Sequence, residues 1–406
     1  MAVECRGTSR QANINASHHK FGGAHSRDFS LSRSALLFWG LVIIATPFYV
    51  FSSGLPQPAD LMLALLIGAS LALWGWGLHP QIMPAVSWGI AFFLLTVIVN
   101  LAFGVVRQNL SYLSAVLFML FNATTFVFAI AMYYSEPARF TAATGNAAAM
   151  SLVLQSVLSF ALGGVSHGRA HLFFNNPNQL GYFALTTATL LVICSHRAKL
   201  IRGALPVGLI SGLYLAALSL SKAALLGYAL LSLIEWLHLP ARMRWRLAFA
   251  AGAVVIGVVL SGVVDRWLIL SNVSARLQSV GSSSDDNLAA RGYGRIVSYP
   301  QYLAFGSGEG EPSRWVLGQA KELHSSWGTI LFAYGFLGLS LFVGFLVSTA
   351  QTAGLRRFAY LTPLFFYGLT HQGLREPLFW VTIAMILVSP QSMRFDGGRN
   401  QATASV

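Results

Sequence analysis

The chain has 406 residues, of which 55% are hydrophobic and only 10% are charged. Soluble domains carry about 25% charged residues, so a water-soluble globule, a disordered chain and a disulfide-stapled secreted protein are excluded. The formal net charge of +13 does not indicate nucleic acid here, because in a chain this apolar the basic residues mark the loops between membrane spans. We therefore expect an all-α polytopic membrane protein with the lipid bilayer as its partner.

Apolar runs of about 17 to 25 residues, bounded by charges, Pro or Gly, predict about twelve transmembrane helices. Residues 1–33 form a polar tail without the pattern of a signal peptide. We expect nine helices within 34–265, a long polar loop over 266–325, three helices within 326–390 and a second polar tail over 391–406. The predicted spans lie near 35–53, 60–78, 84–105, 110–133, 142–165, 179–195, 204–220, 223–238, 246–264, 326–350, 358–371 and 377–390.

The basic residues also predict the orientation of these spans. Most of the 26 lysines and arginines fall on one side, including those at Arg139, Arg197, Arg242 and Arg356. Cytoplasmic loops of membrane proteins carry an excess of Lys and Arg. The pattern therefore predicts that both termini are cytoplasmic and that the long loop 266–325 faces the other side of the membrane.

The long loop contains a predicted helix with two arginines. Three serines and two aspartates at 282–286 form a capping sequence, so a helix should begin there and run towards Pro300. Arg291 and Arg295 are four residues apart and would share a face of that helix. Two planar guanidinium groups suit a diphosphate, since each can donate two charge-assisted hydrogen bonds. Pairing with Asp285, Glu309 or membrane phosphates is the alternative.

Two features follow this predicted helix. The segment 306–310 (Gly-Ser-Gly-Glu-Gly) predicts a flexible turn that permits close approach of backbone to a ligand. His324 ends the loop where the apolar run begins, so its imidazole should lie at the membrane face. An imidazole beside a basic helix can act as a general base, although an isolated histidine more often has a structural role.

Polar segments outside the long loop supply further candidates. Arg169 lies in a short outer loop, against the topological bias, and precedes the segment Asn175-Asn176-Pro177-Asn178. That segment is either a substrate contact through Asn176 and Asn178 or only a turn that starts a helix. Lys222 follows a Ser-Leu-Ser sequence in another outer position. His371 and Arg375 emerge on the same side, where an Arg375–Glu376 contact or lipid binding is the alternative to a substrate role.

Taken in order, these segments resemble the O-antigen ligase and polymerase superfamily of bacterial envelope glycan enzymes. That family has an Arg before an F-x-N-P-N segment, then Ser-Arg-Gly/Ala, and then a large periplasmic loop with an Arg-containing helix, a Gly-x-Gly turn and a terminal His. The similarity covers about 145–350, whereas the first four spans match only in character. Lys222 stands where the family has Arg, and Ser325 stands where the family has Asn.

The resemblance implies a GT-C-like helical fold in the bacterial inner membrane, with the active site facing the periplasm. It implies transfer of a glycan from undecaprenyl diphosphate to an acceptor sugar hydroxyl, with inversion at the anomeric carbon. Arg291 would hold the diphosphate, with Arg295, Lys222 and Arg169 as further contacts, and His324 would activate the acceptor.

Preorganised cations can stabilise a departing diphosphate, so we expect neither a metal nor another cofactor. The acceptor is either the lipid A core, in a ligase, or another repeat unit, in a polymerase, and no motif separates the two. A polysaccharide transporter or flippase is the alternative function. It would require charged residues near the middle of the membrane, whereas the candidates here cluster at the outer face.

Overall fold

The computed structural model describes residues 33–52, 54–74, 78–162, 169–244, 291–315 and 323–388, together with 273, 274 and 278. Regular structure in these residues is helical throughout, which confirms the all-α prediction. The α-helices are α1 (Arg33–Ala45), α2 (Pro58–Trp74), α3 (Met83–Arg107), α4 (Ser111–Ser135), α5 (Pro137–Ala161), α6 (Pro177–Ser195), α7 (Ala204–Ser219), α8 (Lys222–His238), α11 (Gly294–Ser298), α12 (Ser326–Ala353), α13 (Leu355–Phe358), α14 (Thr362–Thr370) and α15 (Pro377–Leu387).

The predicted helical segments are found where the apolar runs placed them. Each predicted span coincides with a helix except 246–264, which lies outside the described residues. The two polar tails are also outside the described residues. Several helices begin with proline, at Pro58, Pro137, Pro177 and Pro377. Proline suits the first helical position because its fixed φ is already helical and the amide hydrogen it lacks would have no partner there.

The number of membrane spans differs from the prediction. Among the described residues, three helices are long and apolar enough to cross a membrane: Pro80–Arg107, Ser111–Ser135 and Ser326–Ala353. This falls short of the twelve or so spans expected, because several apolar runs are longer than their helices. The 13 residues of α1 rise only about 20 Å, against a hydrocarbon core of about 30 Å. Pro47 disfavours a helical conformation at Thr46, so α1 ends at Ala45 although the apolar run continues.

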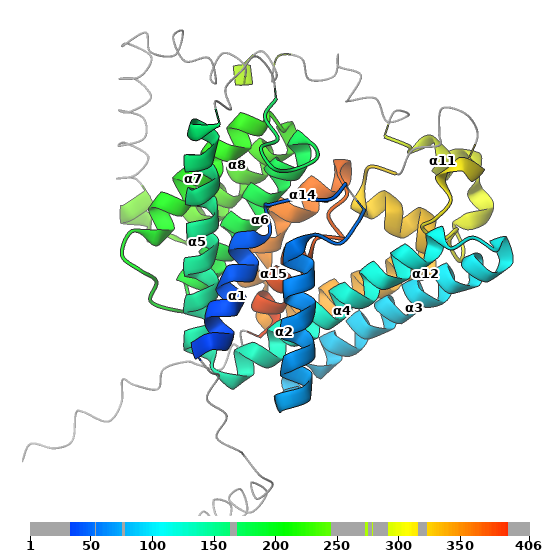
Figure 1. Cartoon of the computed structure of the whole chain (residues 1–406), viewed down its shortest axis with the longest axis horizontal. Helices are drawn as coiled ribbons and strands as arrows, with labels where there is room; N and C mark the ends of the chain where they lie inside the picture. The colour runs from blue at the N-terminus through cyan, green and yellow to red at the C-terminus, as the bar shows by residue number, and fades with distance from the viewer. Residues whose placement is uncertain are drawn as a thin grey trace, which may run out of the picture.

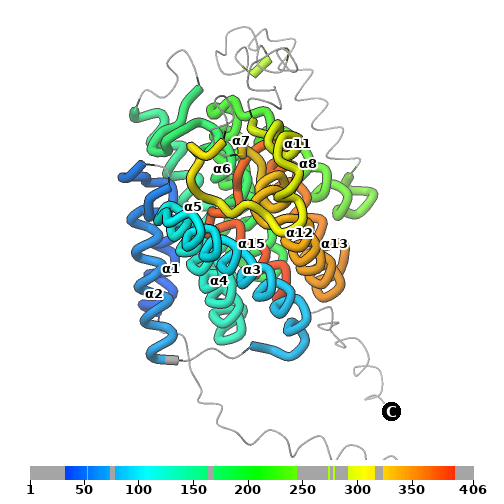
Figure 2. The backbone as a smooth tube through the Cα atoms, turned by 90° about the vertical axis from the view of Figure 1, so that its right-hand side faces the viewer, coloured from blue at the N-terminus to red at the C-terminus, as the bar shows by residue number. Residues whose placement is uncertain are grey.

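The helices form two groups joined by a buried helix. Figure 1 shows α5 to α8 together on one side and α3, α4 and α12 inclined on the other, and Figure 2 shows α1 and α2 side by side at one edge. Helix α15 packs against both α4 and α6. All its residues from Leu378 to Leu387 are buried, as expected for a helix that is apolar on every face.

The connecting segments lie at two opposite ends, which we name after the residues flanking α6. The Asn176 end holds the segments around 46–57, 169–176 and 371–376, joined for example by the Asn175 side chain donating to Phe51 O (3.2 Å). The His196 end holds 196–203 and the residues that follow α8 and α12. Basic residues at the His196 end are therefore separated from the candidate site residues by the length of the helices.

Helix α12 is kinked at Gly335, and a loop fits into the kink. Gly335 has a φ of 69°, and residues 303–308 pack against the interrupted turn. Backbone hydrogen bonds join the two: Phe336 N to Leu303 O (2.6 Å), Ser307 N to Phe332 O (3.1 Å) and Gly308 N to Ala333 O (2.9 Å). A Cβ on Gly306 would lie 2.2 Å from Ala333 O. The glycines in 306–310 were predicted to admit a ligand, but at Gly306 the close approach is to the backbone of α12.

Candidate functional site

A cavity of about 620 Å³ lies at the Asn176 end of the bundle, and we call it the central cavity. Segments far apart in the sequence form its wall: 46–60, 176–182, 367–377 and the single residues 118 and 324. Its polar and charged lining includes Thr46, Tyr49, Gln57, Asp60, Asn176, Asn178, Gln179, Tyr182, His324, Tyr367, His371, Gln372, Arg375 and Glu376. The cavity therefore brings together the predicted candidates His324, Asn176, Asn178, His371 and Arg375.

His324 is positioned by its backbone and by the start of α12. Its amide donates to Arg291 O (3.0 Å), which joins the end of the loop to the segment that precedes α11. The next residue, Ser325, is the N-cap of α12: its hydroxyl accepts a hydrogen bond from Gly328 N (3.0 Å) and donates to Gly368 O (3.1 Å). Ser325, which departs from the resembling family, thus has a helix-capping role that serine fulfils well.

The first turn of α12 is also bonded to the segment that carries His371. Ser326 N donates to His371 O (3.1 Å), and Gly373 N donates to the Ser326 hydroxyl (2.9 Å). The Gln372 side chain donates to the Thr329 hydroxyl (3.0 Å). These bonds fix the two sides of the cavity that bear His324 and His371 relative to each other.

The two asparagines begin α6. Asn176 is its N-cap, and its side chain accepts a hydrogen bond from Gln179 N (3.0 Å). Asn178 Oδ1 accepts from the Arg169 guanidinium (2.5 Å), and its backbone oxygen accepts from the Tyr367 hydroxyl (2.7 Å). Both residues therefore have structural partners while they line the cavity.

Arg169 and Lys222 do not line the central cavity. Besides its bond to Asn178, Arg169 donates to Ser219 O (3.2 Å) and so links the end of α7 to the start of α6. Lys222 is the first residue of α8, directly after the N-cap Ser221. The hydrogen bonds of Arg169 therefore connect two helices.

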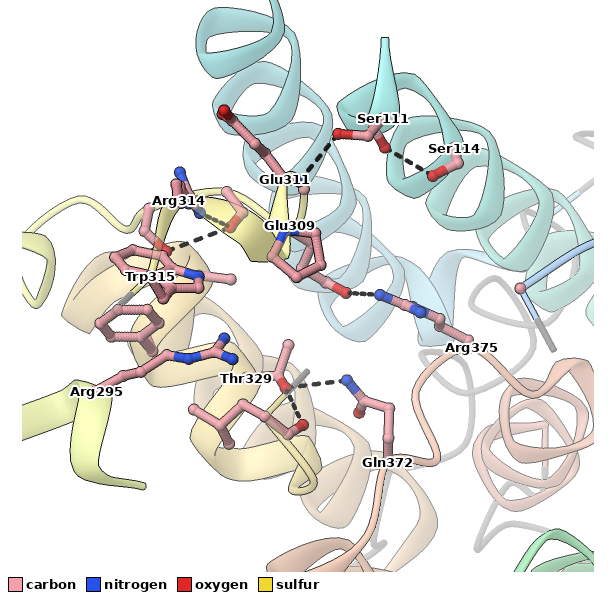
Figure 3. A pocket seen from close by; sticks show the side chains of 18 of the residues that line it. Ser111, Ser114, Arg295, Glu309, Glu311, Arg314, Trp315, Thr329, Gln372 and Arg375 are labelled. Atoms are coloured by element: carbon pink, nitrogen blue, oxygen red, sulfur yellow. Dashed lines mark hydrogen bonds and ion pairs between the residues drawn. The ribbon is translucent and has the colours of Figure 1, made fainter. Parts of the chain in front are cut away.

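A smaller cavity of about 210 Å³ adjoins the central cavity, and we call it the arginine cavity (Figure 3). The two share Gln372 and Arg375 in their walls. Arg295 lines the arginine cavity, is only 5% exposed, and places its guanidinium carbon 5.5 Å from the centre of the Trp315 ring. Arg314 also contacts Trp315, with its guanidinium carbon 4.2 Å from the centre of the ring.

Arg291 is arranged differently from the prediction. The described helix α11 spans only Gly294–Ser298, and 291–293 form a turn before it, so Arg291 and Arg295 do not share a helix face. The predicted cap at 282–286 lies outside the described residues. The Arg291 guanidinium donates to Thr370 O at the end of α14. Arg291 therefore joins the loop to the segment that carries His371, and it lines neither cavity.

Glu309 has a central role that the sequence did not reveal. Its carboxylate accepts from Arg375 (2.8 Å) and from the Tyr334 hydroxyl, and its amide donates to the Asn100 side chain (2.7 Å). The Glu309 side chain is 5% exposed. From the sequence, Glu309 was considered only as a partner for the loop arginines, whereas in the structure it pairs with Arg375.

Glu376 lines the central cavity together with Tyr49 and Asp60. The Tyr49 hydroxyl donates to Glu376 Oε1 (3.2 Å). Burial, together with the negative charge of Asp60, raises the pKa of Glu376 to about 7. A carboxyl group with this pKa exchanges protons near neutral pH. Tyr49 and Asp60 lie in one segment of the wall and Glu376 in another, and no spacing rule connects the two segments.

We expect Glu376→Gln to change the pH dependence of stability. Because the pKa of Glu376 is raised from 4.5 to about 7, folding favours its neutral form, and wild-type stability falls as pH rises through this window. The glutamine variant should melt at a higher temperature than wild type at pH 8 and at a similar one at pH 4.5. Thermal unfolding of the detergent-solubilised protein across pH would show this difference. A constant difference between the two proteins at every pH would contradict it.

The two cavities together combine groups that can bind an anion with groups that can move a proton. Guanidinium groups line the arginine cavity, whereas an imidazole and a carboxyl group of raised pKa line the central cavity. Within the described part of the chain, no three His, Cys, Asp or Glu side chains are placed to hold one metal ion. The arrangement suits a substrate that carries phosphate on one side and hydroxyl groups on the other.

No family model matches the chain, and no curated protein matches its sequence.

Proposed function

We propose that this protein is a membrane glycosyltransferase of the O-antigen ligase type. It would transfer a glycan from undecaprenyl diphosphate to a sugar hydroxyl on the lipid A core or on another repeat unit. The observation that supports this most directly is the convergence of His324, Asn176, Asn178, His371 and Arg375 on one cavity beside a second cavity lined by arginines. These residues were selected from the sequence as separate motifs.

In the proposed reaction the donor diphosphate lies towards the arginine cavity. Arg295 and Arg314 supply positive charge there, and Arg375, which is paired with Glu309, adds a third guanidinium as a hydrogen-bond donor. As the bond from the anomeric carbon to the diphosphate oxygen breaks, the diphosphate takes the electron pair. Fixed cations in a partly buried site stabilise that charge without rearranging, which lowers the barrier.

The acceptor hydroxyl lies in the central cavity in this proposal. Its oxygen forms the new bond to the anomeric carbon on the face opposite the departing diphosphate, and its proton passes to the imidazole of His324. Glu376 lines the same cavity and is a second group that can accept a proton near neutral pH. Asn178 and His371 would orient the sugar by hydrogen bonds.

The proposal places the protein in the bacterial inner membrane, with the Asn176 end facing the periplasm. The three helices long enough to span a bilayer support a membrane location. The positive residues at the His196 end, such as Arg197 and Arg356, support a cytoplasmic position for that end.

We expect His324→Ala to reduce transfer by about 10²- to 10⁴-fold, the usual contribution of a general base. The assay uses the purified, detergent-solubilised protein with a polyprenyl-diphosphate glycan and either a lipid A core or a repeat-unit acceptor. Lipid release and glycan product are both followed, with and without EDTA. Product on the lipid A core would indicate a ligase, whereas longer repeats would indicate a polymerase.

His79→Ala is the matched control, because His79 is exposed and caps the short helix before α3, away from both cavities. It should transfer at the wild-type rate. Wild-type transfer by His324→Ala would overturn the role of His324. If the wild-type protein releases no lipid diphosphate with either acceptor, a flipping assay with the same glycan lipid tests the transporter alternative.

A further inference from the structure

A third cavity, of about 800 Å³, lies at the His196 end of the bundle, and we call it the basic basin. It is formed where the ends of α6, α8, α12 and α15 meet, on the opposite side of the molecule from His324. Its polar wall consists of His196, Arg197, His238, Arg356, Arg357 and Tyr360.

The basin has an excess of positive charge. Three arginines and two histidines line it, and none of the described lining residues is acidic. The carboxylate of Glu235, which does not line the basin, accepts a hydrogen bond from His196 Nε2 (2.8 Å) and is therefore paired with that imidazole. The three guanidinium groups therefore dominate the potential of the basin.

Contacts within the protein hold these groups in place. The Tyr360 hydroxyl lies 3.1 Å from His196 Nε2 and 2.5 Å from His238 Nδ1, so it bridges the two imidazoles. Arg356 donates to His238 O (3.2 Å), which ties the segment after α12 to the end of α8. Because the groups come from separate helices and are mutually bonded, the basin is preformed.

Arg197 lies deepest in this arrangement. Its guanidinium donates to Met385 O near the end of α15. Burial lowers the pKa of Arg197 to about 10, and Arg197 is therefore still positively charged at neutral pH. A half-buried arginine bonded to a carbonyl oxygen keeps further donor hydrogens for an anion.

Apolar side chains flank the cationic wall. Leu355, which precedes Arg356, is 78% exposed, and Leu237, which precedes His238, is 52% exposed. Ile193 and Ile386 contribute to the lining itself. A soluble anion would gain nothing from contact with these apolar side chains, whereas the acyl chains of a lipid would bury them.

We propose that the basic basin binds phosphate groups in the form of the headgroup of an anionic lipid. Two or three guanidinium groups can bind phosphate oxygens by charge-assisted bonds, and basic recesses between helix ends on one side of a membrane are typical sites for such headgroups. This site is independent of the proposed transferase activity, since it lies at the other end of the bundle.

The test measures lipid binding to the full-length protein in detergent. Cardiolipin, phosphatidylcholine and inorganic phosphate are each titrated while the thermal unfolding midpoint is recorded, and retained lipids are counted by native mass spectrometry. We expect cardiolipin to raise the midpoint and to remain bound, and phosphatidylcholine to do neither. The double variant Arg356→Gln/Arg357→Gln should bind cardiolipin roughly 30-fold more weakly, since each lost arginine weakens binding about fivefold.

Arg139→Gln is the matched control, because Arg139 is exposed at the same end, paired with Glu136 (3.1 Å), and outside the basin. It should bind cardiolipin like wild type. Equal binding by the double variant, or equal stabilisation by phosphatidylcholine, would overturn the proposal. Stabilisation by inorganic phosphate at the lipid's own concentration would assign the site to a soluble anion and overturn the lipid assignment. Should the double variant not fold, absence of retained cardiolipin on the wild-type protein also overturns it.

Discussion

Glu309→Ala is expected to lower the free energy of unfolding by roughly 2–4 kcal/mol, because it removes the carboxylate that pairs with the partly buried Arg375 guanidinium, whose side chain is 25% exposed. Glu309 accepts hydrogen bonds from Arg375 and Tyr334, and its side chain is only 5% exposed. Removal of the carboxylate would leave the Arg375 guanidinium and the Tyr334 hydroxyl without this acceptor. The same change should collapse the wall shared by the central and arginine cavities, so transfer activity should fall as well.

Equilibrium unfolding in mixed detergent micelles would measure this loss. The exposed pair Arg107–Glu311 (3.0 Å) anchors the same loop and supplies the control. Glu311→Ala should change stability little, because the charge that it leaves behind, Arg107, has a side chain that is 46% exposed and is solvated by water. The double variant Glu309→Ala/Arg375→Ala should be less destabilised than Glu309→Ala alone. If Glu309→Ala and Glu311→Ala have similar effects, the buried pair does not have the role assigned to it.

Gly335→Ala should destabilise the protein by roughly 2–4 kcal/mol, from backbone strain and overpacking together. Gly335 has a φ of 69°, which side chains disfavour, and a Cβ there would lie 2.4 Å from Ala304 O. Because the obstructing atom belongs to the backbone, the loop 303–308 would have to move away from α12. That loop continues into Glu309, so the arginine cavity should be disturbed too.

Limited proteolysis would detect release of the loop, and thermal unfolding would give the loss of stability. Gly68→Ala is the control, since Gly68 lies in α2 and a Cβ there meets no atom within 4 Å. It should be neutral or stabilising by up to about 1 kcal/mol, because alanine is the better helix former. Resistance of Gly335→Ala to proteolysis, with a wild-type midpoint, would show that the loop does not depend on the kink.

The positions of the helices could be predicted from hydropathy and proline placement, as α3, α4 and α12 show. The number of long spans could not, because an apolar run does not reveal where the helix within it ends. Around Pro47 the run continues although α1 has ended at Ala45. The composition of α15 shows only that it is apolar, and its burial against both α4 and α6 depends on packing between distant segments.

Members of the candidate site could be predicted where a single residue has a side chain suited to catalysis or to binding. His324 and Arg375 could be chosen because a histidine or an arginine at a membrane face is unusual, and both line the central cavity. The residues that contact these side chains could not be predicted in this way. Glu309 meets Arg375 and Tyr334 through three-dimensional contacts, and Glu376 acquires its raised pKa from burial and from Asp60, which lies in a distant segment.

The bonds between Ser326, His371 and Gly373 have a consequence for motion. The start of α12 and the segment after α14 are joined through the Ser326 hydroxyl and amide, so the two segments should move as one rigid body. His324 lies at one end of this body and His371 at the other. A ligand that enters the central cavity would therefore meet two histidines whose backbones are held at a fixed separation, and less conformational entropy would be lost in aligning their side chains.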